Sequence, residues 1–132
     1  MVVLYIESST PEFEIQIDPP LESPKWIVLR NASVGIPSSL FAPQEIHVKC
    51  DLIDTENVRY ASNGQAQRSD LLAILHAVKS NQIAFHGTNQ PRVLTKSLKH
   101  VYRMKFRICY AKGSPIPFPP EKVKLEVEVL SC

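Results

Sequence analysis

Apolar and polar side chains alternate along four short segments of the chain, and this period of two predicts half-buried β-strands. The segments are residues 12–17, 46–52, 102–110 and 123–129. Each of them has one apolar face, and we expect that face to point into a core. The inward residues are Phe13, Ile15 and Ile17; Ile46, Val48, Cys50 and Leu52; Tyr102, Met104, Phe106, Ile108 and Tyr110; and Val123, Leu125, Val127 and Val129.

Three further segments are apolar without alternation. Residues 2–6 and 26–29 have the pattern of strands that are covered on both faces, and residues 82–85 are a candidate short strand. These segments give seven or eight strands, which is enough for a two-sheet antiparallel sandwich in one domain over residues 1–132. We expect the last two long strands to pair as a hairpin across the Pro-rich connection 112–120.

One segment has the spacing of a helix. Ser69 offers an N-cap hydroxyl, Asp70 would lie in the first turn, and apolar residues recur at positions 71, 74, 75 and 78. The sequence therefore predicts two to three helical turns over residues 69–78, placed against an open end or side of the sandwich.

Composition agrees with an all-β fold and a reducing compartment. The chain has 11 proline residues, which favour short strands and stiff loops over long helices. Its three cysteines form neither a disulfide framework nor a metal motif. We expect Cys50 to be buried and Cys109 to lie on the outer face beneath a neighbour, whereas Cys132 is terminal. No signal peptide is visible, and no apolar run reaches the ~20 residues of a membrane span.

Local patterns of catalytic or metal-ligating residues are lacking. The four histidines, at positions 47, 76, 86 and 100, have neither HxH nor HExxH spacing. The sequence contains no Gly-rich phosphate loop and no GxSxG motif. We therefore expect no catalytic residues, no metal ligands and no cofactor, and the chain is not predicted to be an enzyme.

Charge is sorted along the chain although the net charge is only +2. Residues 71–120 contain eight Lys and Arg residues and no Asp or Glu. Within them Arg103, Lys105 and Arg107 form a candidate basic face, which could contact nucleic acid non-specifically and in a salt-sensitive way. The alternative is internal pairing, in which these residues face Glu126 and Glu128 across the last two strands.

The order of these segments resembles that of a known family. The segments are Tyr5–Ser9, Phe13–Ile17, Pro20–Leu21 with Lys25–Leu29, Ser33 before a Pro-containing loop, Ile46–Ile53, Ser69–Leu72, Gln90–Pro91, and two long strands around the turn Gly113–Phe118. In this order the chain resembles the penton-type single jelly-roll minor capsid proteins of Polinton (Maverick) elements, adintoviruses and related small DNA viruses. The resemblance implies a single jelly roll that self-associates around a capsid vertex, as a pentamer rather than a trimer. It also implies contacts with other capsid subunits in a virion that is assembled in the host cytoplasm or nucleus.

Leu40, Phe41 and Phe118 lie in Pro-flanked loops and are candidate subunit contacts. They could equally cap the open ends of their own sandwich. Two other functions remain open on the sequence. One is a ligand-binding jelly roll such as a trimeric tumour-necrosis-factor-like module, and the other is a β module that binds nucleic acid non-specifically.

Overall fold

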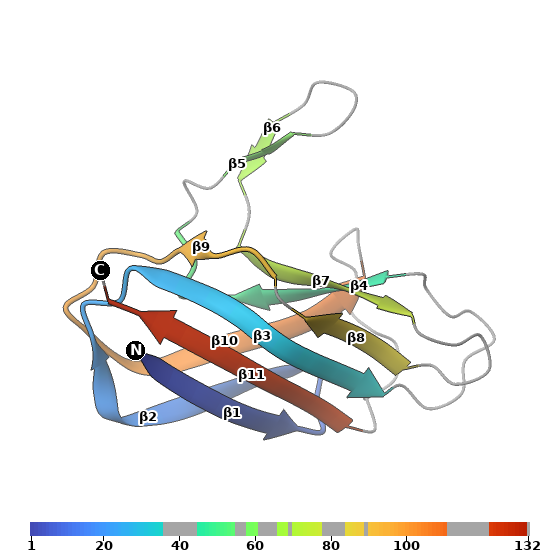
Figure 1. The fold of residues 1–132 in the computed structure, drawn as a ribbon, viewed down its shortest axis with the longest axis horizontal. Helices are drawn as coiled ribbons and strands as arrows, with labels where there is room; N and C mark the ends of the chain where they lie inside the picture. The colour runs from blue at the N-terminus through green and yellow to red at the C-terminus, as the bar shows by residue number, and fades with distance from the viewer. Residues whose placement is uncertain are drawn as a thin grey trace.

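The regular elements that the structure describes are all β-strands (Figure 1). The computed structural model describes residues 1–35, 45–54, 58–60, 66–68, 70–77, 84–88, 90–110 and 122–131, and no helix occurs in these ranges. The strands are β1 (Val2–Ser8), β2 (Glu12–Glu22), β3 (Trp26–Gly35), β4 (Glu45–Cys50), β5 (Val58–Tyr60), β6 (Ala66–Arg68), β7 (Leu71–Ala77), β8 (Ala84–Thr88), β9 (Val93–Leu94), β10 (His100–Tyr110) and β11 (Lys122–Leu130).

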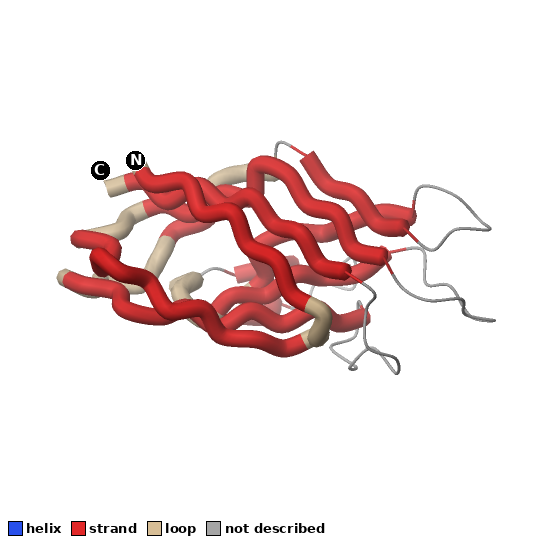
Figure 2. The backbone as a smooth tube through the Cα atoms, turned by 90° about the horizontal axis from the view of Figure 1, so that it is seen from below, coloured by secondary structure: helices blue, strands red, loops and turns tan. Residues whose placement is uncertain are grey.

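Eight strands form an antiparallel sandwich with jelly-roll order. Neighbouring strands follow one another as β1-β11-β3-β8-β7-β4-β10-β2, and the path folds over between β8 and β7. Two four-stranded layers result, β1-β11-β3-β8 and β7-β4-β10-β2 (Figure 2). Successive strands mostly alternate between the two layers, as they do in a jelly roll. The expected all-β, jelly-roll-like sandwich is therefore confirmed.

The sandwich is closed on one side and open on the other. On the closed side β7 pairs with β8, where His76 lies opposite His86. On the open side β1 and β2 are the two ends of the strand order. The short strand β9 pairs with the beginning of β3, and β5 and β6 form a separate hairpin that Figure 1 draws away from the sandwich.

The expected hairpin of the last two strands is wrong. β10 pairs with β2 and β4, whereas β11 pairs with β1 and β3, so the two strands belong to opposite layers. Alternation along a strand specifies which face is buried, but it does not specify the partner strand. The connection between them, residues 112–120, is also too long and too rich in proline for a tight hairpin turn.

The expected helix over residues 69–78 is also wrong, because Leu71–Ala77 forms strand β7 between β4 and β8. Leu71, Leu72, Ala73 and Leu75 are all buried. A short apolar run fits both the spacing of a helix and a strand that is covered on both faces. Pairing with two neighbours decides the outcome, since two isolated helical turns are marginal in water.

The core lies between the layers and contains most of the residues predicted to point inward. Phe106 and Met104 are fully buried, and the ring of Phe13 stacks on that of Phe106 with centroids 5.6 Å apart. The assignment of Tyr102 to the core is wrong, since its side chain is 61% exposed and Val101 is buried instead. The pairing of β10 with β2 shifts register between residues 101 and 103, and such an irregularity reverses the alternation.

The two segments predicted to be covered on both faces differ. In β3 the consecutive residues Ile27, Val28 and Leu29 are all buried, which confirms the prediction there. In β1 the prediction is wrong, because Val2 is 43% and Tyr5 78% exposed. Among the described strands β1 pairs with β11 alone, so β1 lies at the edge of its sheet.

Candidate interaction surfaces

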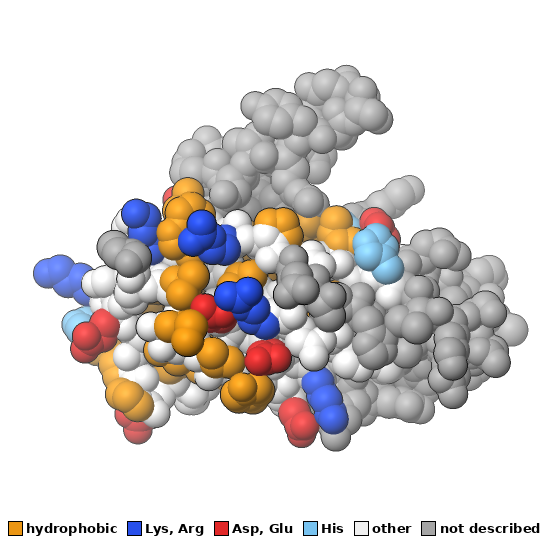
Figure 3. All heavy atoms as spheres, in the orientation of Figure 1, with side chains coloured by type: hydrophobic (Ala, Val, Ile, Leu, Met, Phe, Trp, Pro, Cys, Tyr) orange, Lys and Arg blue, Asp and Glu red, His pale blue; other side chains and the backbone are white. Residues whose placement is uncertain are grey.

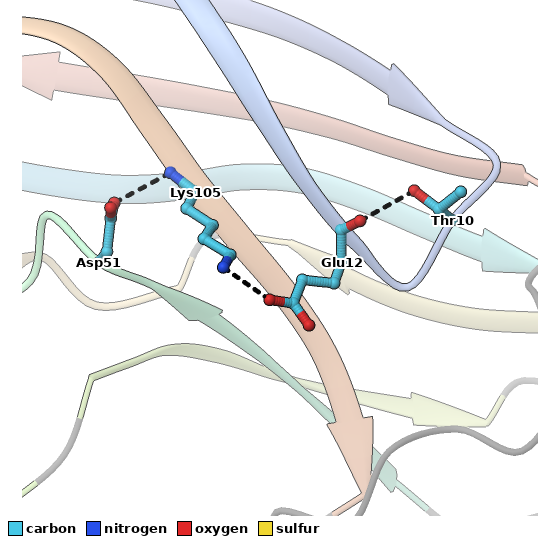
Figure 4. Close-up of polar contacts among 4 residues, drawn as sticks. All are labelled: Thr10, Glu12, Asp51 and Lys105. Atoms are coloured by element: carbon cyan, nitrogen blue, oxygen red, sulfur yellow. Dashed lines mark hydrogen bonds and ion pairs between the residues drawn. The ribbon is translucent and has the colours of Figure 1, made fainter.

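The candidate basic residues lie on the outer face of β10, where β2 places acidic residues beside them. Lys105 pairs in register with Glu14, and Arg107 with Glu12. The Lys105 Nζ atom lies 2.8 Å from Oε1 of Glu12, as Figure 4 shows. Internal pairing therefore occurs, but the expected partners on β11 are wrong, because β11 belongs to the other layer.

Backbone groups also hold this charged face together near the middle of β10. The Lys105 amide donates to Oδ1 of Asp51 at 2.9 Å, and the Asp51 amide donates to the carbonyl of Lys105 at 3.1 Å. The Thr10 hydroxyl donates to the Glu12 carbonyl at 3.0 Å (Figure 4). The ammonium of Lys105 lowers the pKa of Glu12, and the carboxylate in turn raises the pKa of Lys105.

A shallow pocket of about 210 Å³ lies on the same face. Its charged lining residues are three bases and three acids, namely Lys49, Lys105, Arg107, Glu12, Asp51 and Asp70. Lys49 and Arg107 are directly opposite each other across β4 and β10, and Lys49 Nζ lies 3.7 Å from Oδ1 of Asp70. Because its charges nearly balance, this face lacks the positive excess that attracts a phosphate backbone.

The two described cysteines are both buried, as expected for Cys50 and for a covered Cys109. Burial raises the pKa of the Cys50 thiol to about 12 and also raises the pKa of Cys109. Thiols in this state are weak nucleophiles at neutral pH, since the thiolate is the reactive form. Cys132 lies outside the described residues.

The strand pairing places histidines near one another in a way that local spacing does not reveal. His76 is the register partner of His86 on β8 and of Glu45 on β4. His47, next along the same face of β4, has its Nε2 atom 3.3 Å from Oε1 of Glu45. Within the described part of the chain, no group of three or more His, Cys, Asp or Glu side chains is arranged to hold a metal ion.

The outer face of the β1-β11-β3 layer is more apolar than the opposite face. Val3 and Tyr5 of β1 point outward, with Glu128 and Glu126 of β11 as their register partners. Farther along the same face, Leu130 of β11 lies opposite Trp26 of β3. Figure 3 shows hydrophobic side chains gathered over β1, the end of β11 and the beginning of β3. We call these four outward residues the apolar face.

Two cationic side chains are held within or beside the apolar face. The guanidinium of Arg30 forms an ion pair with Glu128, whose carboxylate is 7% exposed, and this contact lowers the pKa of Glu128. The guanidinium of Arg92 lies over the ring of Trp26, 5.1 Å from its centroid. Trp26 is half-buried, and tryptophan, tyrosine and arginine are the residues enriched at the energetic centre of protein–protein interfaces.

The open side of the sandwich carries a groove of about 600 Å³ between β1 and β2. From β1 it is lined by Val2, Leu4 and Ile6, and from β2 by Ile15 and Ile17, among others. Leu4 and Ile15 are only partly buried although they pack against the core. Sequence reasoning missed this groove because it treated residues 2–6 as an interior strand.

Comparisons with known proteins add no name to this geometry. No protein-family model matches the chain, and no curated protein matches it with significance.

Among the described residues, no helix has the length and apolar character needed to cross a membrane. The candidate loop contacts Leu40, Phe41 and Phe118 lie outside the described residues.

Proposed function

We propose that this protein is a capsid-type structural subunit that packs beside further copies of itself, most favourably as a pentamer around a vertex. The proposal is supported chiefly by a jelly-roll strand order that carries an apolar outer face on one layer. Jelly rolls with this architecture are the usual building unit of viral capsid domains. The same fold also occurs in ligand-binding proteins, so the apolar face is the more specific support.

A closed ring needs two different surfaces on each subunit, because each copy contacts one neighbour with one patch and the next neighbour with another. The two layers of the sandwich provide such a pair. One outer face is apolar around Tyr5 and Trp26, and the other carries the balanced charges around Lys105. The buried core between the layers keeps the two surfaces in a fixed relation.

The experiment that tests this function is size exclusion coupled to light scattering, with negative-stain electron microscopy of the same fractions. We expect a pentameric mass or larger particles. A Tyr5→Arg variant should lower the mass, whereas Tyr102→Arg is the matched control, because Tyr102 is similarly exposed but belongs to the other layer.

The measured mass of the oligomer distinguishes the capsid-type function from the other candidate functions. A strict monomer at high concentration, with no particles, contradicts the proposal. A trimer would instead favour a ligand-binding jelly roll. An unchanged pentamer in Tyr5→Arg would show that the ring forms without the apolar face, and the capsid-type function would lose its main support.

A further inference from the structure

We propose that β1 is a self-pairing edge, at which β1 of a second copy adds antiparallel and joins the two β1-β11-β3-β8 sheets into one. The proposal does not depend on the ring described above, because a two-fold contact doubles the mass of whatever unit the chain forms. It commits to a second copy of this chain as the occupant of the edge.

The edge of β1 lacks the features that keep edge strands from pairing. Its seven residues pair with β11 in unbroken register, and it contains no Lys, no Pro and no bulge. Within the described residues, no strand pairs with its other edge. The open edge of β2, by contrast, contains Pro19 and Pro20 and displays Glu12 and Glu14.

The sequence of β1 is complementary to itself in the antiparallel direction. If two copies pair about Leu4, then Leu4 faces Leu4 of the second copy, and Val2 faces Ile6 of the second copy on the core side. On the outer side Val3 faces Tyr5 of the second copy. Every one of these opposed pairs is apolar, and pairs of aromatic with β-branched residues are favourable across strands.

The charge of β1 also suits a second copy. Glu7 is the only charged side chain in Val2–Ser8, and it lies near one end of the strand. Antiparallel pairing about Leu4 places the two Glu7 residues six positions apart, which is about 20 Å at the rise of a β-strand. Each Glu7 stays beside Lys124 of its own chain, its register partner on β11, so no like charges become opposed.

The size of the contact predicts a weak dimer. A seven-residue strand extends about 23 Å, and edge pairing covers less than the ~800 Å² per partner of a stable interface. The partly exposed Val2 and Leu4, at the mouth of the groove between β1 and β2, add apolar area. We therefore expect dissociation in the range of about 10–100 µM.

The test is sedimentation velocity of the whole chain from about 5 to 500 µM, with two variants that remove the same apolar surface. In V3K/Y5K the proposed register opposes Lys to Lys twice, whereas in V3K/Y5E it opposes Lys to Glu twice. We expect doubling of mass in the wild type and in V3K/Y5E, and at least a tenfold weaker association in V3K/Y5K. Circular dichroism of both variants confirms that they are folded.

Several outcomes overturn the inference. A wild type whose mass never doubles across this range excludes the contact. Equal association of the two variants excludes this register, whether both associate or neither does. Failure of the ring proposal looks different, since it gives monomers and dimers without pentamers, whereas failure of this inference leaves pentamers that do not double.

Discussion

The two outer faces of the sandwich follow the same strand alternation but expose different chemistry. On β10 and β2 most outward positions are charged, and Lys105 contacts Glu12 at 2.8 Å. On β1 and the start of β3 the outward positions include Tyr5 and Trp26, and the cations beside them pair with Glu128 or stack on an aromatic ring. The charged face is well hydrated as it stands, whereas the apolar face exposes side chains that a neighbouring molecule could cover.

The same difference separates β1 and β2, the two strands at the ends of the described strand order. β2 carries prolines and carboxylates, which protect an edge from further pairing, whereas β1 is a short and mostly apolar strand. The two proposals above therefore place stability and association in different parts of the molecule. Substitutions on each part should therefore affect different measurements.

The largest expected effect is the difference in the free energy of unfolding between a core variant and a surface variant. Phe106→Ala removes a fully buried ring that stacks on Phe13, and it should lower the free energy of unfolding by about 3–5 kcal/mol. Tyr5→Ala, which removes a ring that is 78% exposed, should change it by less than about 0.5 kcal/mol. Urea unfolding at low protein concentration measures both. Similar losses in the two variants would contradict the assignment of Tyr5 to an uncovered surface.

The second prediction concerns the basic residues of β10. E12Q/E14Q removes the two carboxylates that pair in register with Arg107 and Lys105, and it raises the net charge of that face by two. We expect roughly tenfold tighter binding of a labelled oligonucleotide at low salt, with a steeper loss as salt rises. Fluorescence anisotropy measures the affinity. Tight binding by the wild type at low salt would instead revive the nucleic-acid function.

The residues of β10 show which features can be predicted from the sequence and which cannot. Alternation identified most of the inward residues of β2, β4, β10 and β11, with Tyr102 as an exception, because the period of two is a local property of a strand. It assigned Arg103, Lys105 and Arg107 to the wrong acids, since the choice between β2 and β11 as partner depends on contacts between distant segments. A jelly roll is built from such non-local pairings.

The errors at residues 69–78 and at β1 have a common cause. Apolar content alone does not distinguish a helix, a central strand and an exposed edge strand. β7 pairs with β4 on one side and with β8 on the other, whereas β11 is the one described strand that pairs with β1. Neither of the candidate surfaces at β1, the apolar face and the open edge, could therefore be predicted before the strand order was known.

The smallest effect compares the ion pairs of the two faces through their pH dependence. Glu128 and Glu12 both have a pKa below the ordinary value of 4.5, because each carboxylate accepts a hydrogen bond from a cation. A pKa that is lower in the folded state stabilises the fold above the unfolded value, and this stabilisation is lost as the pH falls through the folded value. The melting temperature should therefore decrease as the pH falls below about 4.5.

The two carboxylates should contribute unequally to this decrease. Glu128 is 7% exposed, whereas Glu12 is 53% exposed and its ion pair is screened by water and salt. We expect E128Q to flatten the acid-induced decrease in melting temperature more than E12Q does, and added salt to weaken only the contribution of Glu12. Calorimetry between about pH 3 and pH 7 measures both slopes. If E12Q flattened the curve more, the shielded ion pair of the apolar face would not be the stronger of the two.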